Sequence, residues 1–119
     1  MAIVNITVEN DADFYRVFQY AVVNPDGSIA GPVNITGAAM EMMLRRRAED
    51  ASALLRLATD TGEIALVDPT NGKFTVLIAQ NTLEQLGLGD FDHSNIMTLN
   101  GLKTKIWSGT FTNNAGATR

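Results

Sequence analysis

The sequence predicts an all-β domain, an antiparallel β-sandwich of about seven to nine strands with one short helical turn. Three observations lead to this prediction. Short segments of alternating apolar and polar residues recur along the 119 residues, β-branched residues are frequent in them, and turns rich in glycine, proline or asparagine separate them. Because this length suits one ordinary domain, we expect a single domain over residues 1–119, with a flexible C-terminal tail at 113–119.

The first half of the chain supplies the first strand candidates. Ile3–Val8 alternates apolar and polar residues, and Phe14–Val23 is a second β-rich stretch. A turn at Asn24-Pro25-Asp26-Gly27 follows, because proline presets φ and glycine accepts a positive φ. Val33–Gly37 then leads into a third strand candidate that begins at Ala38.

Further strand candidates follow in the second half, each bounded by turn residues. They are Leu54–Thr59, Ile64–Val67, Lys73–Ala79, Phe91–Leu99 and Leu102–Thr112. Asn100-Gly101 joins the last two and is the most characteristic dipeptide of a two-residue hairpin. Before them, Asn81–Leu86 is typical of a single helical turn that opens at a capping asparagine and closes at Gly87.

Residues 40–58 allow two interpretations. They are strong helix formers, and their apolar residues fall at helical spacing: Met40, Met43, Leu44, Ala48, Ala51, Leu54, Leu55 and Ala58. Local periodicity alone therefore favours a helix of about five turns. The alternation over Ala38–Arg45 fits a strand equally well, with an exposed loop at Arg46–Ser52.

The composition argues against several classes of function. A net charge of −4 is unlike the basic footprint of a nucleic-acid-binding domain, and the one basic cluster, Arg45-Arg46-Arg47, is expected to be surface charge. With no cysteine, the chain has neither disulfides nor a thiol nucleophile, as befits folding in a reducing cytoplasm. The sequence lacks a signal-peptide pattern and an apolar run of the roughly 18–20 residues that span a membrane. We expect neither nucleic acid nor membrane as a partner.

The candidate catalytic residues are isolated from one another. His93 is the only histidine and is interpreted as a surface residue near a strand start, not as a general base. Asp11 and Asp13 are expected in a solvated turn, although paired carboxylates can flank a substrate. Gly87-Leu88-Gly89 lacks the third glycine of a phosphate-binding loop. We therefore predict that the chain is not an enzyme, with no catalytic residues, no cofactor-binding residues, no cofactor and no buried polar cluster suited to catalysis.

One acidic segment bears on calcium binding. Asp90-x-Asp92-x-Ser94 resembles the start of a calcium-binding loop. The sixth position of such a loop requires glycine and the twelfth requires glutamate, but here they are Asn95 and Gly101. We therefore predict no metal-binding residues.

The aromatic residues raise the possibility of carbohydrate binding. Trp107, Tyr15 and Tyr20 are candidates for a platform on which sugar rings stack. Aromatic residues make up only 7% of the chain, and simple alternation puts Trp107 on the same strand face as Lys103 and Lys105. Packing in the core or at a subunit interface is the favoured use of Trp107.

The order and spacing of several segments between Asp26 and Arg119 carry a resemblance. These segments are Asp26-Gly27 with Val33–Ala38, Met40–Arg45, Leu54–Leu66, Asn71–Val76, the residues Leu83, Leu86, Gly89 and Phe91, Trp107–Thr112, and Thr118-Arg119. Together they resemble a family of small phage virion proteins related to the immunoglobulin-like N-terminal domain of phage baseplate upper proteins. The segment Asp92–Ile96 is more polar than the family pattern, which leaves the register of that strand open.

The resemblance implies a fold and a function. In the family, the region around Met40 is a strand, a loop and another strand, so the resemblance favours an immunoglobulin-like sandwich over the helix. It implies a non-enzymatic structural component of a bacteriophage particle, in its tail or baseplate, made in the bacterial host cytoplasm and found in the virion. The expected partners are other virion proteins and further copies of the chain, bound by edge-strand addition and apolar patches. The alternatives are a phage-borne carbohydrate-binding module for host recognition and a capsid decoration or head–tail joining protein.

Overall fold

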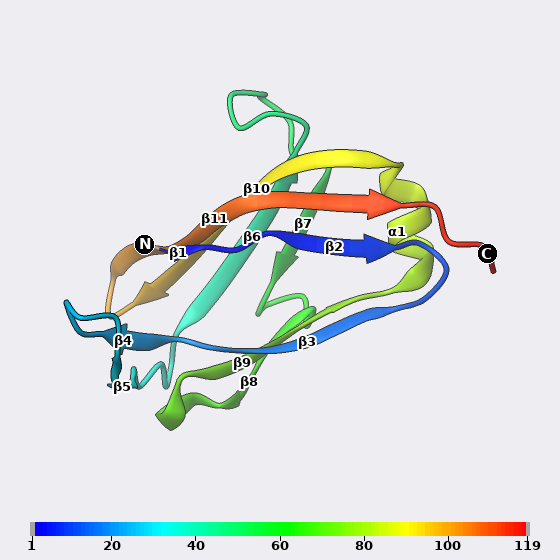
Figure 1. Cartoon of the computed structure of the whole chain (residues 1–119). Coiled ribbons are helices and arrows are strands. Elements are labelled where there is room, and N and C mark those ends of the chain that lie inside the picture. Colours follow the sequence, from blue (N-terminus) through cyan, green and yellow to red (C-terminus); the bar gives the residue numbers. More distant parts are fainter. Residues whose placement is uncertain (1, 119) are drawn as a thin grey trace.

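The computed structural model describes residues 2–118 as a two-layer β-sandwich (Figure 1). The larger layer runs in the order β1-β11-β10-β6-β7, and β2 also pairs with β11. The bounds of its strands are β1 (Ala2–Ile3), β2 (Ile6–Glu9), β6 (Ala39–Arg45), β7 (Leu55–Ala58), β10 (Gly89–Leu99) and β11 (Leu102–Asn114). The predicted all-β sandwich is thereby confirmed.

The smaller layer runs in the order β3-β9-β8, and a separate hairpin, β4-β5, extends it. The bounds are β3 (Phe14–Gln19), β4 (Ala21–Val23), β5 (Ile29–Pro32), β8 (Ile64–Asp68) and β9 (Lys73–Ile78). A 3-10 turn at Pro69–Asn71 joins β8 to β9. The eleven strands within residues 2–118 exceed the predicted seven to nine, because β1/β2 and β3/β4 are interrupted strands and β5 was not predicted.

Residues 40–58, for which the sequence allowed either a helix or strands, form a strand, a loop and a second strand. Met40, Met42 and Leu44 of β6 are buried against the smaller layer, while Glu41 and Arg45 point away from it. β6 pairs with β10 on one side and with β7 on the other. An isolated helix would satisfy the same backbone groups locally, but only the sheet pairing also buries this alternating apolar face.

Two parts of the strand prediction need correction. β1 and β2 run parallel to β11, so the larger layer is mixed and not purely antiparallel. In β11, the pairing with β10 skips Ile106, and this bulge buries both Ile106 and Trp107. Lys103 and Lys105 therefore stay exposed while Trp107 enters the core, where simple alternation had put all three on one face.

The hairpin turn is determined by its own two residues, whereas the start of the helix is held by a residue far away in the sequence. Asn100 and Gly101 both have positive φ (54° and 79°), as the predicted two-residue hairpin requires. Helix α1 spans Gln80–Leu86 and therefore begins one residue earlier than expected. Its N-cap residue is Ala79, which makes no side-chain capping hydrogen bond. Instead, the backbone N–H of Gln80 donates to Oδ1 of Asp13, 2.7 Å away.

The last strand extends further toward the C-terminus than predicted. Asn113 and Asn114 belong to β11, opposite Val8 and Glu9 of β2. Beyond them, the backbone N–H of Gly116 donates to Oδ1 of Asn10 at 2.9 Å. The boundary of the expected tail is thus corrected from 113 to beyond the end of β11, and Arg119 lies outside the described residues.

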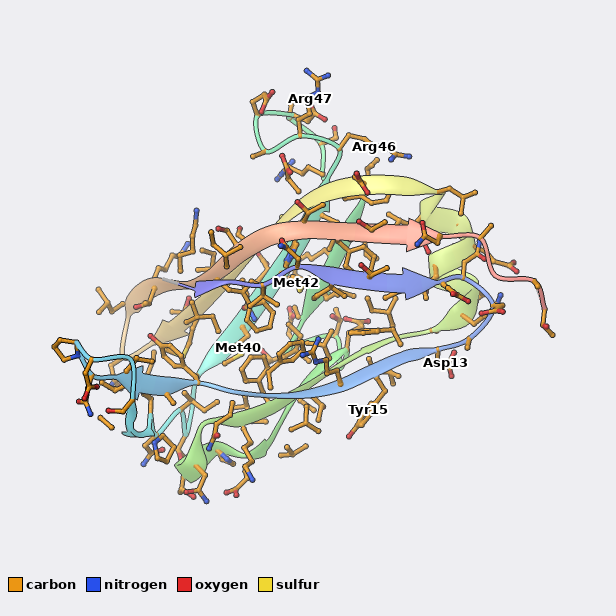
Figure 2. All side chains as sticks on the ribbon, in the orientation of Figure 1. Asp13, Tyr15, Met40, Met42, Arg46 and Arg47 are labelled. Carbon is orange, nitrogen blue, oxygen red and sulfur yellow. The ribbon has the colours of Figure 1, made fainter. Side chains whose placement is uncertain are left out.

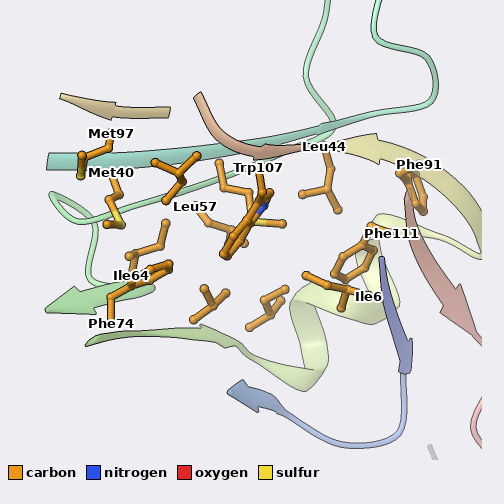
Figure 3. Packing of buried hydrophobic residues seen from close by; sticks show 14 of the residues in the cluster. Ile6, Met40, Leu44, Leu57, Ile64, Phe74, Phe91, Met97, Trp107 and Phe111 are labelled. Atoms are coloured by element: carbon orange, nitrogen blue, oxygen red, sulfur yellow. The ribbon is translucent and has the colours of Figure 1, made fainter. Parts of the chain in front are cut away.

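The core lies between the layers and contains two groups of aromatic rings (Figure 3). Near the start of β11, the rings of Phe18, Phe74 and Trp107 pack together, with centroids 4.7–5.7 Å apart. Toward the other end, Phe91 and Phe111 are both 1% exposed or less. Within residues 2–118, the one α-helix has seven residues, and no helix is long and apolar enough to cross a membrane.

Candidate interaction site

His93 lies inside the sandwich, which corrects its assignment to the surface. It belongs to β10, and only 5% of it is exposed. Its Nε2–H donates to the carbonyl oxygen of Val4 at 2.8 Å, since a carbonyl can only accept. Burial lowers the pKa of His93 below its ordinary value of 6.5, and the Val4 hydrogen bond and the Asp92 charge oppose this only in part. The folded protein therefore favours the neutral form of the His93 imidazole.

The contact with His93 belongs to a junction between β1 and β2. The first strand is interrupted at two residues, Val4 and Asn5, although the backbone N–H of Val4 still donates to the carbonyl oxygen of Ser108 in β11 at 2.9 Å. The side chain of Asn5 accepts the backbone N–H of Thr110 at 3.0 Å. Gly109 faces this junction, where a Cβ would overlap the Val4 oxygen and lie 2.8 Å from its carbonyl carbon. The interruption of the first strand is therefore fixed by side chains far away in sequence.

Buried polar groups continue along the inner face of β10. Asn95 is fully buried opposite Trp107, and within residues 2–118 neither its amide nor the Trp107 Nε1 has a hydrogen-bond partner. The same holds for Nδ1 of His93. The core thus holds more polar groups than the sequence predicted.

The candidate calcium residues lie on a regular strand and not in a loop. Asp90 accepts the hydroxyl of Thr112 at 2.8 Å, and Asp92 accepts the backbone N–H of Ala48 at 2.9 Å. Both carboxylates therefore hold neighbouring segments in place. In the described part of the chain, no three His, Cys, Asp or Glu side chains are grouped to hold a metal ion.

Asp11 and Asp13 are also engaged with different parts of the fold. Asp13 binds the start of α1, and Asp11 accepts the backbone N–H of Thr118 at 3.4 Å. The end of the helix is held by Asn113, whose side-chain amide donates to the carbonyl oxygens of Leu83 and Gly87 at 2.8 and 2.9 Å. Sequence reasoning missed Asn113, because it had placed this residue in the tail.

The three adjacent arginines are divided between a strand and a loop, because β6 ends at Arg45. Arg46 packs its guanidinium 4.1 Å from the ring centre of Phe91 and donates to the carbonyl oxygens of Leu88 and Asp90. The loop over residues 46–54 projects beyond the sheet, and Arg47 extends from it (Figure 2). Every residue of this loop is exposed.

The aromatic residues do not form a common platform. Trp107 is 5% exposed between the layers, whereas Tyr15 is 62% exposed and points outward from β3 (Figure 2). Tyr20 is half-buried beyond the end of β3. The predicted core packing of Trp107 is therefore confirmed, and these three residues cannot jointly stack a sugar.

One side of the sandwich leaves strand edges exposed. Among the strands of residues 2–118, β3 pairs only with β9, and β4 pairs only with β5. In the larger layer, β1 meets β11 at Trp107 and Ser108, and no strand within residues 2–118 covers the same edge of β11 over Leu102–Ile106. Unpaired edges offer backbone donors and acceptors to an incoming strand. This open side is the strongest candidate for an interaction site.

A cleft of about 720 Å³ lies on this open side, between β4 and the start of β11. Its lining is mainly apolar and consists of Val4, Phe18, Gln19, Tyr20, Ala21, Val22, Val23, Val33, Phe74, Thr104, Lys105, Ile106 and Trp107. The residues of this lining come from five separate segments of the sequence, and only the sandwich brings them together. We call it the edge cleft.

Comparisons with known proteins agree with this architecture. No protein-family model matches the chain, and no curated protein matches it. Among solved structures, the chain is similar to the N-terminal domain of ORF48 of phage TP901-1, with a TM-score of 0.51 and 14% sequence identity. The similarity covers 95% of this chain and 85% of that chain. The class of domain is thus an all-β sandwich, and the expected resemblance to an N-terminal domain of a phage protein holds for the fold.

Proposed function

We propose that this chain is a non-enzymatic structural domain of a bacteriophage particle, located in its tail or baseplate. The observation that carries the proposal is the similarity in fold to the N-terminal domain of ORF48 of phage TP901-1, over nearly the whole chain. The sequence resemblance to the N-terminal domain of baseplate upper proteins supports the same role. The chain is made in the host cytoplasm and then incorporated into the virion.

The domain acts by protein–protein assembly, with other virion proteins and with further copies of itself as partners. Rigid sheets that present free strand edges suit this role, because backbone hydrogen bonds supply affinity and adjacent side chains supply specificity.

Particles produced without this protein test the proposal directly. Electron microscopy should show a defect in the tail or baseplate, and complementation with the intact gene should restore normal particles. Immunolabelling of normal particles should place the protein at the tail end. Intact and infectious particles lacking the protein would contradict a structural role, and labelling of the head would favour a capsid decoration or head–tail joining protein.

The carbohydrate-binding alternative loses its main support, since Trp107 is buried and Tyr15 lies on the opposite face of its layer. A glycan array remains the decisive test. Binding that is lost in Tyr15→Ala but retained in Leu77→Ala, an exposed neighbour across the strands, would revive this alternative.

A further inference from the structure

The edge cleft has an unpaired strand edge on each of its two walls. On the wall formed by the smaller layer, the N–H of Tyr20 donates to Gly72 at 2.8 Å, and its carbonyl accepts from Val33 at 2.9 Å. In a strand, both groups of one residue point to the same side. The partners of β3 and β4 therefore lie on one side only, and the opposite edge of Ala21–Val23 faces the cleft.

On the other wall, the edge of β11 is covered only in part. β1 pairs with Trp107 and Ser108, and β2 pairs with Phe111 to Asn114. Ahead of Trp107, the edge at Thr104–Ile106 has no partner among residues 2–118. An additional strand placed here would continue the line of β1 along β11.

The side chains around the cleft suit an apolar strand and not bulk water. Its floor is the ring cluster of Phe18, Phe74 and Trp107, and its rim carries Val22 and Val23, which are 54% and 59% exposed. Among the described residues that line the cleft, Lys105 is the only charged one. Unpaired edges in soluble proteins are usually protected by charged residues or proline. Such protection is present further along the same side, where the guanidinium of Arg16 lies 5.0 Å from the ring centre of Phe18.

We propose, building on the structural role proposed above, that the edge cleft receives an extended strand of another virion protein. The backbone of this strand pairs with the edge of β11 at Thr104–Ile106, in line with β1. Alternate residues of the strand are apolar and contact Val22, Val23 and the ring cluster below, and an acidic residue lies beside Lys105. In this strand addition, backbone hydrogen bonds supply affinity. Specificity comes from the alternate side chains of the added strand that face the cleft.

A tethered strand tests whether the cleft has this capacity. The probe is the sequence Thr-Val-Glu-Val-Thr-Val, joined ahead of Met1 by a glycine–serine linker, and the control extension contains only glycine and serine. The tether keeps the effective concentration of the probe high. We expect the midpoint of thermal unfolding to rise by about 3–6 °C relative to the control extension. We also expect hydrogen exchange of the backbone amides in Thr104–Ile106 to slow at least tenfold.

Two matched variants link this effect to the cleft. Val22→Lys puts a charge on the rim, whereas Val67→Lys changes a residue of equal exposure, 54%, on β8. The probe should lose its effect in Val22→Lys and keep it in Val67→Lys. Both positions are exposed, so circular dichroism should show that both variants fold. Equal behaviour of the two variants, or no slowing of exchange at Thr104–Ile106, would overturn the proposal.

The same pair of variants tests the identity of the occupant in the particle. Val22→Lys should be incorporated at least tenfold less than the normal protein, and Val67→Lys should be incorporated normally. Normal incorporation of Val22→Lys would overturn the edge-cleft proposal, while a tail defect on deletion would leave the structural role intact. If the purified chain dimerises in light scattering and only Val22→Lys abolishes the dimer, a second copy occupies the cleft and the proposal of another virion protein is wrong.

Discussion

The two halves of β11 differ in whether another strand covers their outer edge. The second half, Phe111–Asn114, is covered by β2, and Asn113 reaches beneath it to hold the end of α1. The first half, Leu102–Ile106, is uncovered by any strand within residues 2–118 and faces the edge cleft. The two halves meet at Gly109, beside the junction of Val4 and Asn5.

This difference shows that an edge is closed by more than strand pairing. In the closed half, side chains from distant segments satisfy backbone groups: Asn5 binds Thr110, His93 binds Val4 and Asn10 binds Gly116. Each buried backbone group without a partner would cost free energy, so these contacts stabilise the closed state. In the open half, no side chain within residues 2–118 makes such a contact, and the outer backbone edge remains available to a partner.

The largest effect on the closed half is expected from Gly109→Ala. The new Cβ would overlap the carbonyl oxygen of Val4, so either β11 or the first strand must shift. We expect a loss of about 3 kcal/mol in the free energy of unfolding, measured by urea denaturation. Gly37→Ala is the control, because Gly37 has a φ of +83° but open space around its Cβ position, and should cost only about 1 kcal/mol. Equal losses in the two variants would show that the junction is not tightly packed.

A smaller loss is expected when the cap of α1 is removed. Asn113→Ala leaves the carbonyl oxygens of Leu83 and Gly87 without their donor in a buried site. This change should cost about 2 kcal/mol and speed up hydrogen exchange in α1 more than in β6. Asn114→Ala, at the exposed neighbouring position, should leave both quantities nearly unchanged. A similar effect of the two variants would mean that the Asn113 amide does not hold the helix.

The junction should also make stability depend on pH. Because the pKa of His93 is lowered in the folded protein, the unfolded chain binds this proton first as the pH falls. The contribution of neutral His93 is therefore fully present above pH 6.5 and is lost as the pH falls through the folded-state pKa. His93→Gln should show a flatter fall in unfolding free energy below pH 6.5 than the normal chain, in parallel urea titrations. Identical profiles would exclude His93 as a source of the pH dependence.

The smallest effect is expected in the open half of the strand. Leu102 is 69% exposed, so Leu102→Ser should change the unfolding free energy by less than about 0.5 kcal/mol. A matched change in the closed half, Phe111→Ser at a fully buried position, should prevent stable folding or cost several times more. A large loss in Leu102→Ser would indicate that the open edge is covered in the isolated chain, and the comparison between the halves would then fail.

Much of the fold could be predicted from local sequence patterns. The hairpin at Asn100-Gly101 was predicted correctly because both residues tolerate positive φ. The alternation of Met40, Met42 and Leu44 indicated the buried face of β6, although helix propensity in the same segment competed with it. β5 was missed because Ile29–Pro32 contains glycine and proline, which local propensity assigns to turns.

The candidate site was predicted far less well than the strands. His93 was assigned to the surface, since it lies near a strand start between the polar residues Asp92 and Ser94, and its partner Val4 lies 89 positions earlier. The edge cleft combines residues from β3, β4, β9 and β11. Single positions such as Val22 carry no signal of a cleft, because an exposed valine in a strand is common.

The sequence by itself determined most of the strand segments, the inward face of β6, the tight turn at Asn100-Gly101 and the absence of cysteine chemistry, because these depend on residues a few positions apart. Only the tertiary structure decided which strand edges are covered. That outcome depends on where Asn5, Asn113 and His93 meet backbone groups brought from the other end of the chain, and on the bulge at Ile106 that turns Trp107 into the core. Hydrogen bonds over such separations form only after the layers have packed, so no local pattern encodes them.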